Sequence, residues 1–187
     1  MAKPTKTEAA WLRGNVQRLA RIHFLFVGAI VVQIILYDVW KLLTPDAVMK
    51  RWIIAAILLL VTTICWYLSK EKLGHSGRYR ALVFSLILVD VVVASFLVYV
   101  QRGMASQAVA LYAIPIVVSS VLLSRAAIMA TAFLCTAAYT TTAISYFVLN
   151  FNEGYKIELY GEIGFYSVIF FVIAWCLWTL VKSKRRN

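Results

Sequence analysis

Long apolar runs recur along the chain and are separated by short polar segments. Six such runs are present, at residues 23–43, 51–69, 81–100, 104–124, 126–149 and 159–181. Each has about the 20 residues that an α-helix needs to cross the hydrocarbon core of a bilayer. A single span in lipid must satisfy its own backbone hydrogen bonds, which favours helices. The pattern therefore predicts an all-α membrane protein with six transmembrane helices.

The polar segments between the runs are short enough to join neighbouring antiparallel helices. They include a turn around Pro45, a basic loop with Gly74 and Gly77, and tight turns at 101–103 and at Ser124–Arg125. Short connections of this kind are typical of an up-down helical bundle. The two halves of the chain do not carry matching broken helices, which an inverted-repeat transporter would show.

The segment before the first apolar run has a different pattern. Its apolar residues recur at helical spacing while arginines occupy other positions on the helical wheel; the apolar positions are Trp11, Leu12, Val16, Leu19 and Ile22. This predicts a short amphipathic helix over residues 7–22 that lies in the inner headgroup layer or packs on a partner. The expected organisation is a cytoplasmic segment at 1–22, a six-helix transmembrane domain at 23–181 and a basic cytoplasmic tail at 182–187.

Composition agrees with a membrane protein, and charge gives it an orientation. Hydrophobic residues make up 63% of the chain and charged residues 14%, whereas soluble domains have about 25% charged residues. The net charge is +11, and fourteen of the 19 Lys and Arg residues fall on the side of the six predicted spans that holds both termini. The positive-inside rule then places both termini in the cytoplasm. Because the charge is explained by topology, we expect no nucleic-acid partner.

The residues that catalysis or metal binding would need are missing. No Gly-rich phosphate loop and no nucleophile elbow occurs in the sequence, although both have recognisable patterns. His23 and His75 lack acidic or cysteine companions, and the three cysteines, Cys65, Cys135 and Cys176, all lie inside spans. We therefore expect no catalytic residues, no metal site and no enzymatic activity.

Asp90 stands near the middle of the third span, in Leu88-Val89-Asp90-Val91-Val92. A carboxylate at bilayer depth is costly, so it faces the bundle interior or water. No Lys or Arg lies at comparable depth in any span, and we expect a protonated Asp90 that donates to the Leu111 carbonyl or the Tyr112 hydroxyl. Two interpretations stay open: a ligand contact or proton-sensitive switch, and an interhelical hydrogen bond that only fixes packing.

In two antiparallel spans joined by a short turn, residues that are equally far in sequence from the turn lie at the same membrane depth. Reflecting the position of Asp90 through each turn in this way gives the depth of residues in the other spans. Reflection places Pro115 and Cys135 at the depth of Asp90, with Tyr112 on the Pro115 face. Cruder reflection through the longer loops adds Gln33 and Trp175. A layer of polar groups and an aromatic wall is typical of a small-ligand site between helices, so the predicted ligand-binding residues are Asp90, Tyr112, Pro115, Gln33 and Trp175. The alternative is that unrelated polar residues fall at one depth by chance.

The order of residues 90–125 resembles a known family. After Asp90 come Leu97-Val98-Tyr99-Val100, a turn with Gly103 and Ser106, then Leu111-Tyr112-Ala113-Ile114-Pro115-Ile116 and Leu122-Leu123-Ser124-Arg125. This order resembles the six-span sensor module of RegB/PrrB-type bacterial histidine kinases. Gly103 and Ser106 match the outer turn of that family, whose first Gly, Pro and Phe are absent here.

The resemblance implies a sensory module of the bacterial inner membrane. Its members respond to hydrophobic or redox signals, notably a quinone, and relay them to a cytoplasmic kinase domain or partner protein, commonly as a homodimer. The chain stops at Asn187, where the kinase would begin. Two rivals stay open: a small transporter subunit, such as the substrate-binding component of a vitamin importer, and a structural scaffold without a ligand.

Overall fold

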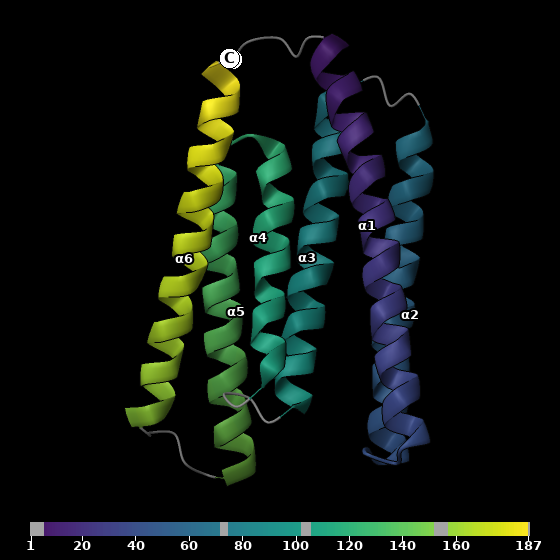
Figure 1. Cartoon of the computed structure of the whole chain (residues 1–187), viewed down its shortest axis with the longest axis vertical. Coiled ribbons are helices and arrows are strands. Elements are labelled where there is room, and N and C mark those ends of the chain that lie inside the picture. Colours follow the sequence, from purple (N-terminus) through teal and green to yellow (C-terminus); the bar gives the residue numbers. More distant parts are fainter. Residues whose placement is uncertain (1–5, 72–74, 102–105, 152–156, 187) are drawn as a thin grey trace. The chain divides into compact units, whose positions relative to one another are not determined.

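A computed structural model describes residues 6–71, 75–101, 106–151 and 157–186, and in this part of the chain it contains helices and no strands. The elements, shown in Figure 1, are α1 (Lys6–Val39), α2 (Pro45–Lys70), α3 (Ser76–Val100), η2 (Gln107–Tyr112), α4 (Ala113–Ser119), η3 (Ser120–Leu122), α5 (Arg125–Phe151) and α6 (Ile157–Arg186). Five helices are long and apolar enough to cross a membrane, and residues 107–122 form a shorter apolar helical stretch. The predicted all-α architecture is confirmed. Gly74, most of the predicted turn at 101–103 and Asn187 lie outside the described residues.

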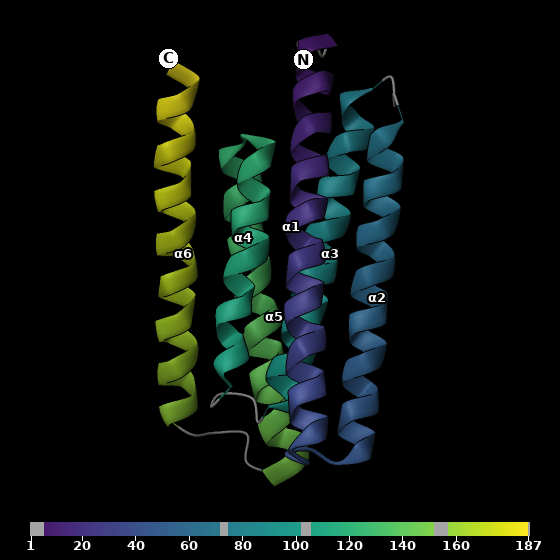
Figure 2. The same ribbon diagram turned by 45° about the vertical axis from the view of Figure 1, so that its right-hand side comes forward.

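The chain divides into two compact units at Leu86 and Ile87. In the first unit α1 and α2 pack along each other (Figure 2), and α3 adds its first half. The buried faces of the two long helices are apolar, with Val16 and Ala20 on α1 and Ala55 and Leu58 on α2 at no more than 2% exposure. Cys65 on α2 contacts the Leu82 carbonyl of α3 at 3.8 Å. The core of this unit therefore forms from helices that follow one another directly in the chain.

The N-terminal amphipathic segment is the first half of α1 and not a helix of its own. The helix is continuous from Lys6 to Val39, and its buried face continues through Leu12 and Val16 into the apolar run. Gly14 does not interrupt it. The helix therefore runs without a break across the predicted boundary between residues 22 and 23, and the same face packs on both sides of it.

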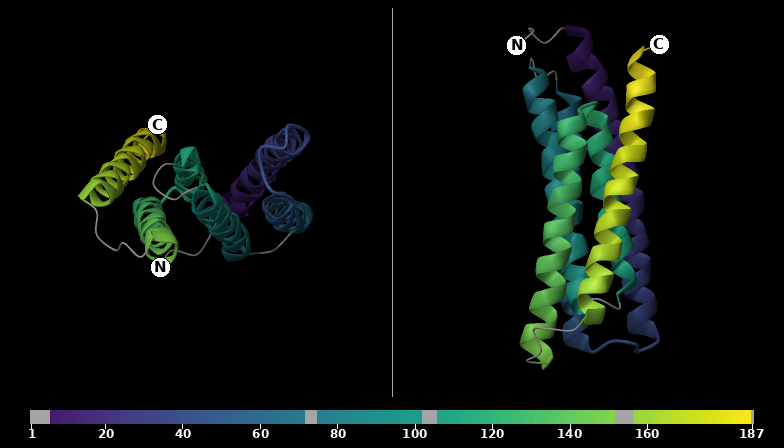
Figure 3. Two further views of the ribbon diagram at one scale, coloured as in Figure 1. Left: turned by 90° about the horizontal axis from the view of Figure 1, so that it is seen from below. Right: turned by 90° about the vertical axis from the view of Figure 1, so that its left-hand side faces the viewer.

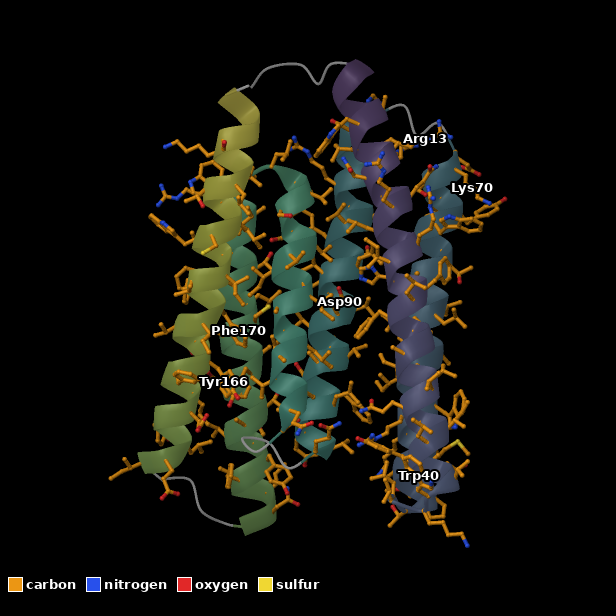
Figure 4. The ribbon with its side chains drawn as sticks, in the orientation of Figure 1. Arg13, Trp40, Lys70, Asp90, Tyr166 and Phe170 are labelled. Atoms are coloured by element: carbon orange, nitrogen blue, oxygen red, sulfur yellow. The ribbon has the colours of Figure 1, made fainter. Side chains whose placement is uncertain are left out.

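Two side chains of α1 bind the last carbonyls of α2. Arg13 Nε donates to the Ser69 carbonyl at 3.1 Å and its Nη2 donates to the Lys70 carbonyl. Gln17 Nε2 donates to the Ser69 carbonyl at 3.1 Å. Helix C-termini leave carbonyls without intrahelical partners, and a cation there also complements the helix dipole. Figure 4 shows Arg13 and Lys70 at the same end of the first unit.

The second unit contains the second half of α3 together with η2, α4, η3, α5 and α6. The α4 segment packs against both α5 and α6, which run antiparallel beside each other (Figure 3). The fully buried side chains of this unit include Tyr112, Ile116, Ile128, Ala132, Cys135, Tyr139, Ala143 and Ala174. The turn into α5 is as tight as the sequence predicts. Leu123 adopts a left-handed conformation at φ 50°, and the Ser124 hydroxyl accepts from the Ala127 amide.

Candidate ligand site in the second unit

Asp90 is buried near the middle of α3 and is 3% exposed (Figure 4). Its sequence neighbours on α3 are Val89 and Val91. Cys135 on α5, which is fully buried, lies within electrostatic range of Asp90. The predicted shared depth of Asp90 and Cys135 agrees with this proximity.

Tyr112, the last residue of η2, connects the helices around it. It is fully buried, and its hydroxyl lies 2.8 Å from Ser95 Oγ on α3. Because Ser95 donates its own proton to the Val91 carbonyl at 2.7 Å, the tyrosine is the donor to Ser95. Thr142 on α5 is also within hydrogen-bonding reach of the Tyr112 hydroxyl. One phenol thus holds α3, η2 and α5 in register.

The position of Ser95 shows in which direction along the helix axis the Tyr112 side chain points. Helical side chains tilt toward the N-terminus of their own helix. In antiparallel neighbours, Tyr112 therefore leans toward the turn at 101–106, where it meets Ser95, while Asp90 leans the other way. The bond predicted from Asp90 to the Leu111 carbonyl or to Tyr112 stays a prediction.

Four rings, which we call the tyrosine cluster, join η2, α5 and α6. The Tyr139 ring on α5 lies 6.0 Å from Tyr112, 5.6 Å from Tyr166 and 6.3 Å from Phe170, all at steep interplanar angles. Tyr112 and Phe170 are 5.7 Å apart. Edge-to-face pairs at these centroid distances are the favoured aromatic geometry. The cluster therefore couples α6 mechanically to the helices that carry Asp90 and Tyr112.

Two hydroxyl groups of α5 next to this cluster have no hydrogen-bond partner among the residues that the structure describes. They are the Tyr139 hydroxyl and Thr136 Oγ1, and both atoms are buried. They are three residues apart and so lie on one face of α5. Leaving a buried donor unsatisfied costs about 1–3 kcal/mol. Such a pair provides donors for an acceptor group on an otherwise apolar molecule. Tyr139 and Thr136 were not among the predicted site residues, although Tyr139 follows Cys135 by four positions and so lies on the same face of α5.

Pro115 is buried beside Ile116 and lies in the first turn of α4. The fourth span is thus a 3₁₀ helix that changes to an α-helix just before the proline, and not one long helix with a kink at its centre. Proline is tolerated in the first turn, where its missing N–H has no intrahelical partner in any case. Pro115 marks the junction that fixes the direction of Tyr112.

Trp175 does not belong to the site. Its side chain is 54% exposed, and the Arg125 guanidinium lies 5.4 Å from the centre of its ring. The inner face of α6 is formed by Phe170 and Ala174, at 1% and 0% exposure. Trp175 lies five residues after Phe170, about 140° around the helix. Reflection through loops estimates depth and not rotation, which is why it selected the wrong face.

Gln33 lies in the first unit, where it is half-buried on α1. Its Nε2 donates to the Tyr37 hydroxyl at 3.3 Å, and the Arg51 guanidinium lies 5.0 Å from the Tyr37 ring centre. Its place in the Asp90 layer stays a prediction. His23 lies midway along α1 and is 2% exposed. Its Nδ1 lies 2.9 Å from the Leu19 carbonyl and donates to it.

Comparison with known families assigns the chain to a described family. The family model described as the PilS-like transmembrane domain matches residues 6–187. This agrees with a six-span sensor module and does not confirm the redox-sensing RegB/PrrB type that residues 90–125 resemble. Neither the curated proteins nor the solved structures gave a match.

Proposed function

The chain belongs to the PilS-like transmembrane domain family, and we propose that it is the membrane-embedded sensory module of a histidine kinase system. PilS itself is a histidine kinase sensor. The module responds to a hydrophobic or redox signal and passes the response to a cytoplasmic kinase domain or partner protein. It lies in the bacterial inner membrane as a homodimer, with both termini in the cytoplasm.

The observation that carries this proposal is the tyrosine cluster. It links the buried polar groups of α3 and η2 to Phe170 on α6, at 1% exposure. From Phe170, α6 continues unbroken to Arg186, about 24 Å further at 1.5 Å per residue. A change in packing among the rings would therefore move α6 as a rigid helix. Its C-terminal end, toward residues 182–187, lies well outside the cluster and would move with it.

The class of signal follows from the groups in the site. A quinone offers carbonyl oxygens as acceptors for the hydroxyls of Tyr139 and Thr136, which are buried without partners among the described residues. Its flat ring suits contacts with the edges and faces of aromatic side chains. Tyr112 contacts the Tyr139 ring, and we assign Asp90 and Pro115 to the same proposed site. Trp175 is excluded from it by its exposure.

The test joins the whole chain, after Asn187, to the dimerisation and ATP-binding parts of a histidine kinase. Autophosphorylation is measured in nanodiscs with oxidised or reduced decylubiquinone. We expect the rate to differ severalfold between the two redox forms. The difference should disappear in Tyr139→Phe and Asp90→Leu and persist in Tyr67→Phe, a matched change at a tyrosine that is 63% exposed on α2.

The sensory function and the quinone signal are contradicted by different results. A phosphorylation rate that does not change when the transmembrane module is replaced by an unrelated anchor contradicts the sensory function. A module that controls the rate but ignores both redox forms contradicts the quinone. Uptake of a solute by liposomes that contain the unfused chain with an ATPase partner would favour the importer.

A further inference from the structure

A shallow apolar groove runs along the exposed face of α6 in the second unit. Its volume is 340 Å³, and its lining consists of Val168, Phe171, Val172, Trp175 and Cys176. Phe133 on α5 supports it, with its ring centre 4.7 Å from that of Phe171. The volume lies within the range of small-molecule sites in proteins, about 300–1,000 Å³. The groove is apolar along its length and open along one side.

Two cations stand at one end of this groove. Arg125, the first residue of α5, places its guanidinium 5.4 Å from the centre of the Trp175 ring. Lys182 follows Trp175 by seven residues, so it lies on the same face of α6 about 10 Å further along. Both side chains are exposed, and neither has an acidic partner among the described residues. An apolar channel that ends at unpaired positive charge is an amphipathic binding surface.

We infer that this surface binds one anionic phospholipid. An acyl chain lies in the groove and the phosphate lies between Arg125 and Lys182, with Trp175 at the boundary between chain and headgroup. Tryptophan prefers this boundary, and basic residues near the ends of membrane helices attract anionic lipids. A second copy of the chain is disfavoured here, because parallel apposition of two α6 helices would bring like charges together. The inference does not depend on the sensory function.

Native mass spectrometry of the full chain provides the test. The protein is released from detergent after incubation with dioleoylphosphatidylglycerol or dioleoylphosphatidylcholine, which have the same acyl chains. We expect preferential retention of phosphatidylglycerol. Arg125→Gln and Lys182→Gln should each lower that preference about fivefold, the contribution expected of one cation near an anionic headgroup.

Matched variants distinguish a specific lipid-binding site from non-specific electrostatic attraction of anionic lipid to the protein. Arg78→Gln removes an exposed cation at the start of α3 and should leave the preference unchanged. Val172→Trp fills the groove and should reduce retention of both lipids, whereas Val148→Trp, at an exposed valine of α5, should not. Circular dichroism checks that each variant keeps its helical content.

Three results would overturn the inference. They are equal retention of the two lipids by the unaltered chain, an equal loss of preference in Arg78→Gln and Arg125→Gln, and retention that is insensitive to Val172→Trp. A stable dimer that Val172→Trp dissociates would assign the groove to a second copy and would also overturn the inference.

Discussion

Tyr112 and Tyr139 are both fully buried in one ring cluster, but their hydroxyl groups differ. The Tyr112 hydroxyl donates to Ser95, whereas that of Tyr139 has no partner among the described residues. A satisfied buried hydroxyl stabilises the fold modestly, and an unsatisfied one destabilises it. The Tyr112 hydroxyl therefore links helices, whereas the Tyr139 hydroxyl is the one that the proposed ligand site uses as a donor.

This difference predicts opposite effects of the same chemical change. Tyr112→Phe should lower the free energy of unfolding by about 0.6–1 kcal/mol, because it removes a hydrogen bond inside the bundle. Tyr139→Phe should raise it by about 1 kcal/mol, because it removes an unsatisfied buried donor. Thermal unfolding in one detergent, followed by circular dichroism, measures both. Destabilisation by Tyr139→Phe would mean that its hydroxyl has an acceptor within the fold, and the site would lose its donor.

Side-chain direction was the part of the site that the sequence could not provide. Reflection through short turns estimates depth, and the electrostatic interaction between Cys135 and Asp90 agrees with the depth predicted for Cys135. Reflection gives no information on rotation about the helix axis. It therefore could not decide whether Trp175 or Phe170 is the residue of α6 that faces the interior. Only packing decides between them, because a residue five positions away faces a direction about 140° different.

At the scale of elements, α1 is one continuous helix across the boundary that the sequence predicts between residues 22 and 23. Polar residues in its first half predict a surface helix, yet Arg13 and Gln17 bind the carbonyls at the end of α2. Because these two polar side chains hydrogen-bond to α2, the polar first half of α1 can pack against α2. The 3₁₀ segment before Pro115 was also unforeseen, since apolar periodicity does not distinguish short 3₁₀ turns from α-helix.

The contact between Arg13 and the end of α2 predicts a local effect. Arg13→Ala should destabilise the last turn of α2 by about 1 kcal/mol, because two carbonyls lose a charged donor. Amide hydrogen exchange of residues near Ser69 should become about fivefold faster, while exchange near Leu58 stays unchanged. Arg18→Ala, at an exposed arginine of the same helix, is the control. Equal acceleration by both variants would show that net charge matters and the specific contact does not.

At the scale of the whole molecule, charge asymmetry predicts the topology. Fourteen of 19 basic residues fall on the side of the predicted spans with both termini, so both termini should be cytoplasmic. Alkaline phosphatase fused after Asn187 should be inactive, and green fluorescent protein fused at the same position should fluoresce. Fusions within the connection between α1 and α2 should give the reverse result. An active phosphatase after Asn187 would contradict both the topology and a cytoplasmic output.

The continuity of α6 predicts how its output depends on helical phase. In the kinase fusion, one alanine inserted between Lys182 and Ser183 rotates everything beyond it by about 100°, whereas seven rotate it by about 700°, or 20° short of two full turns. A rigid helix that passes on rotation or tilt should lose or invert its response with one inserted residue and largely recover it with seven. The distance to the kinase increases far more with seven residues, so recovery cannot come from spacing. A response that declines steadily with the number of inserted residues would indicate a flexible tether, and the rod-like relay through α6 would be wrong.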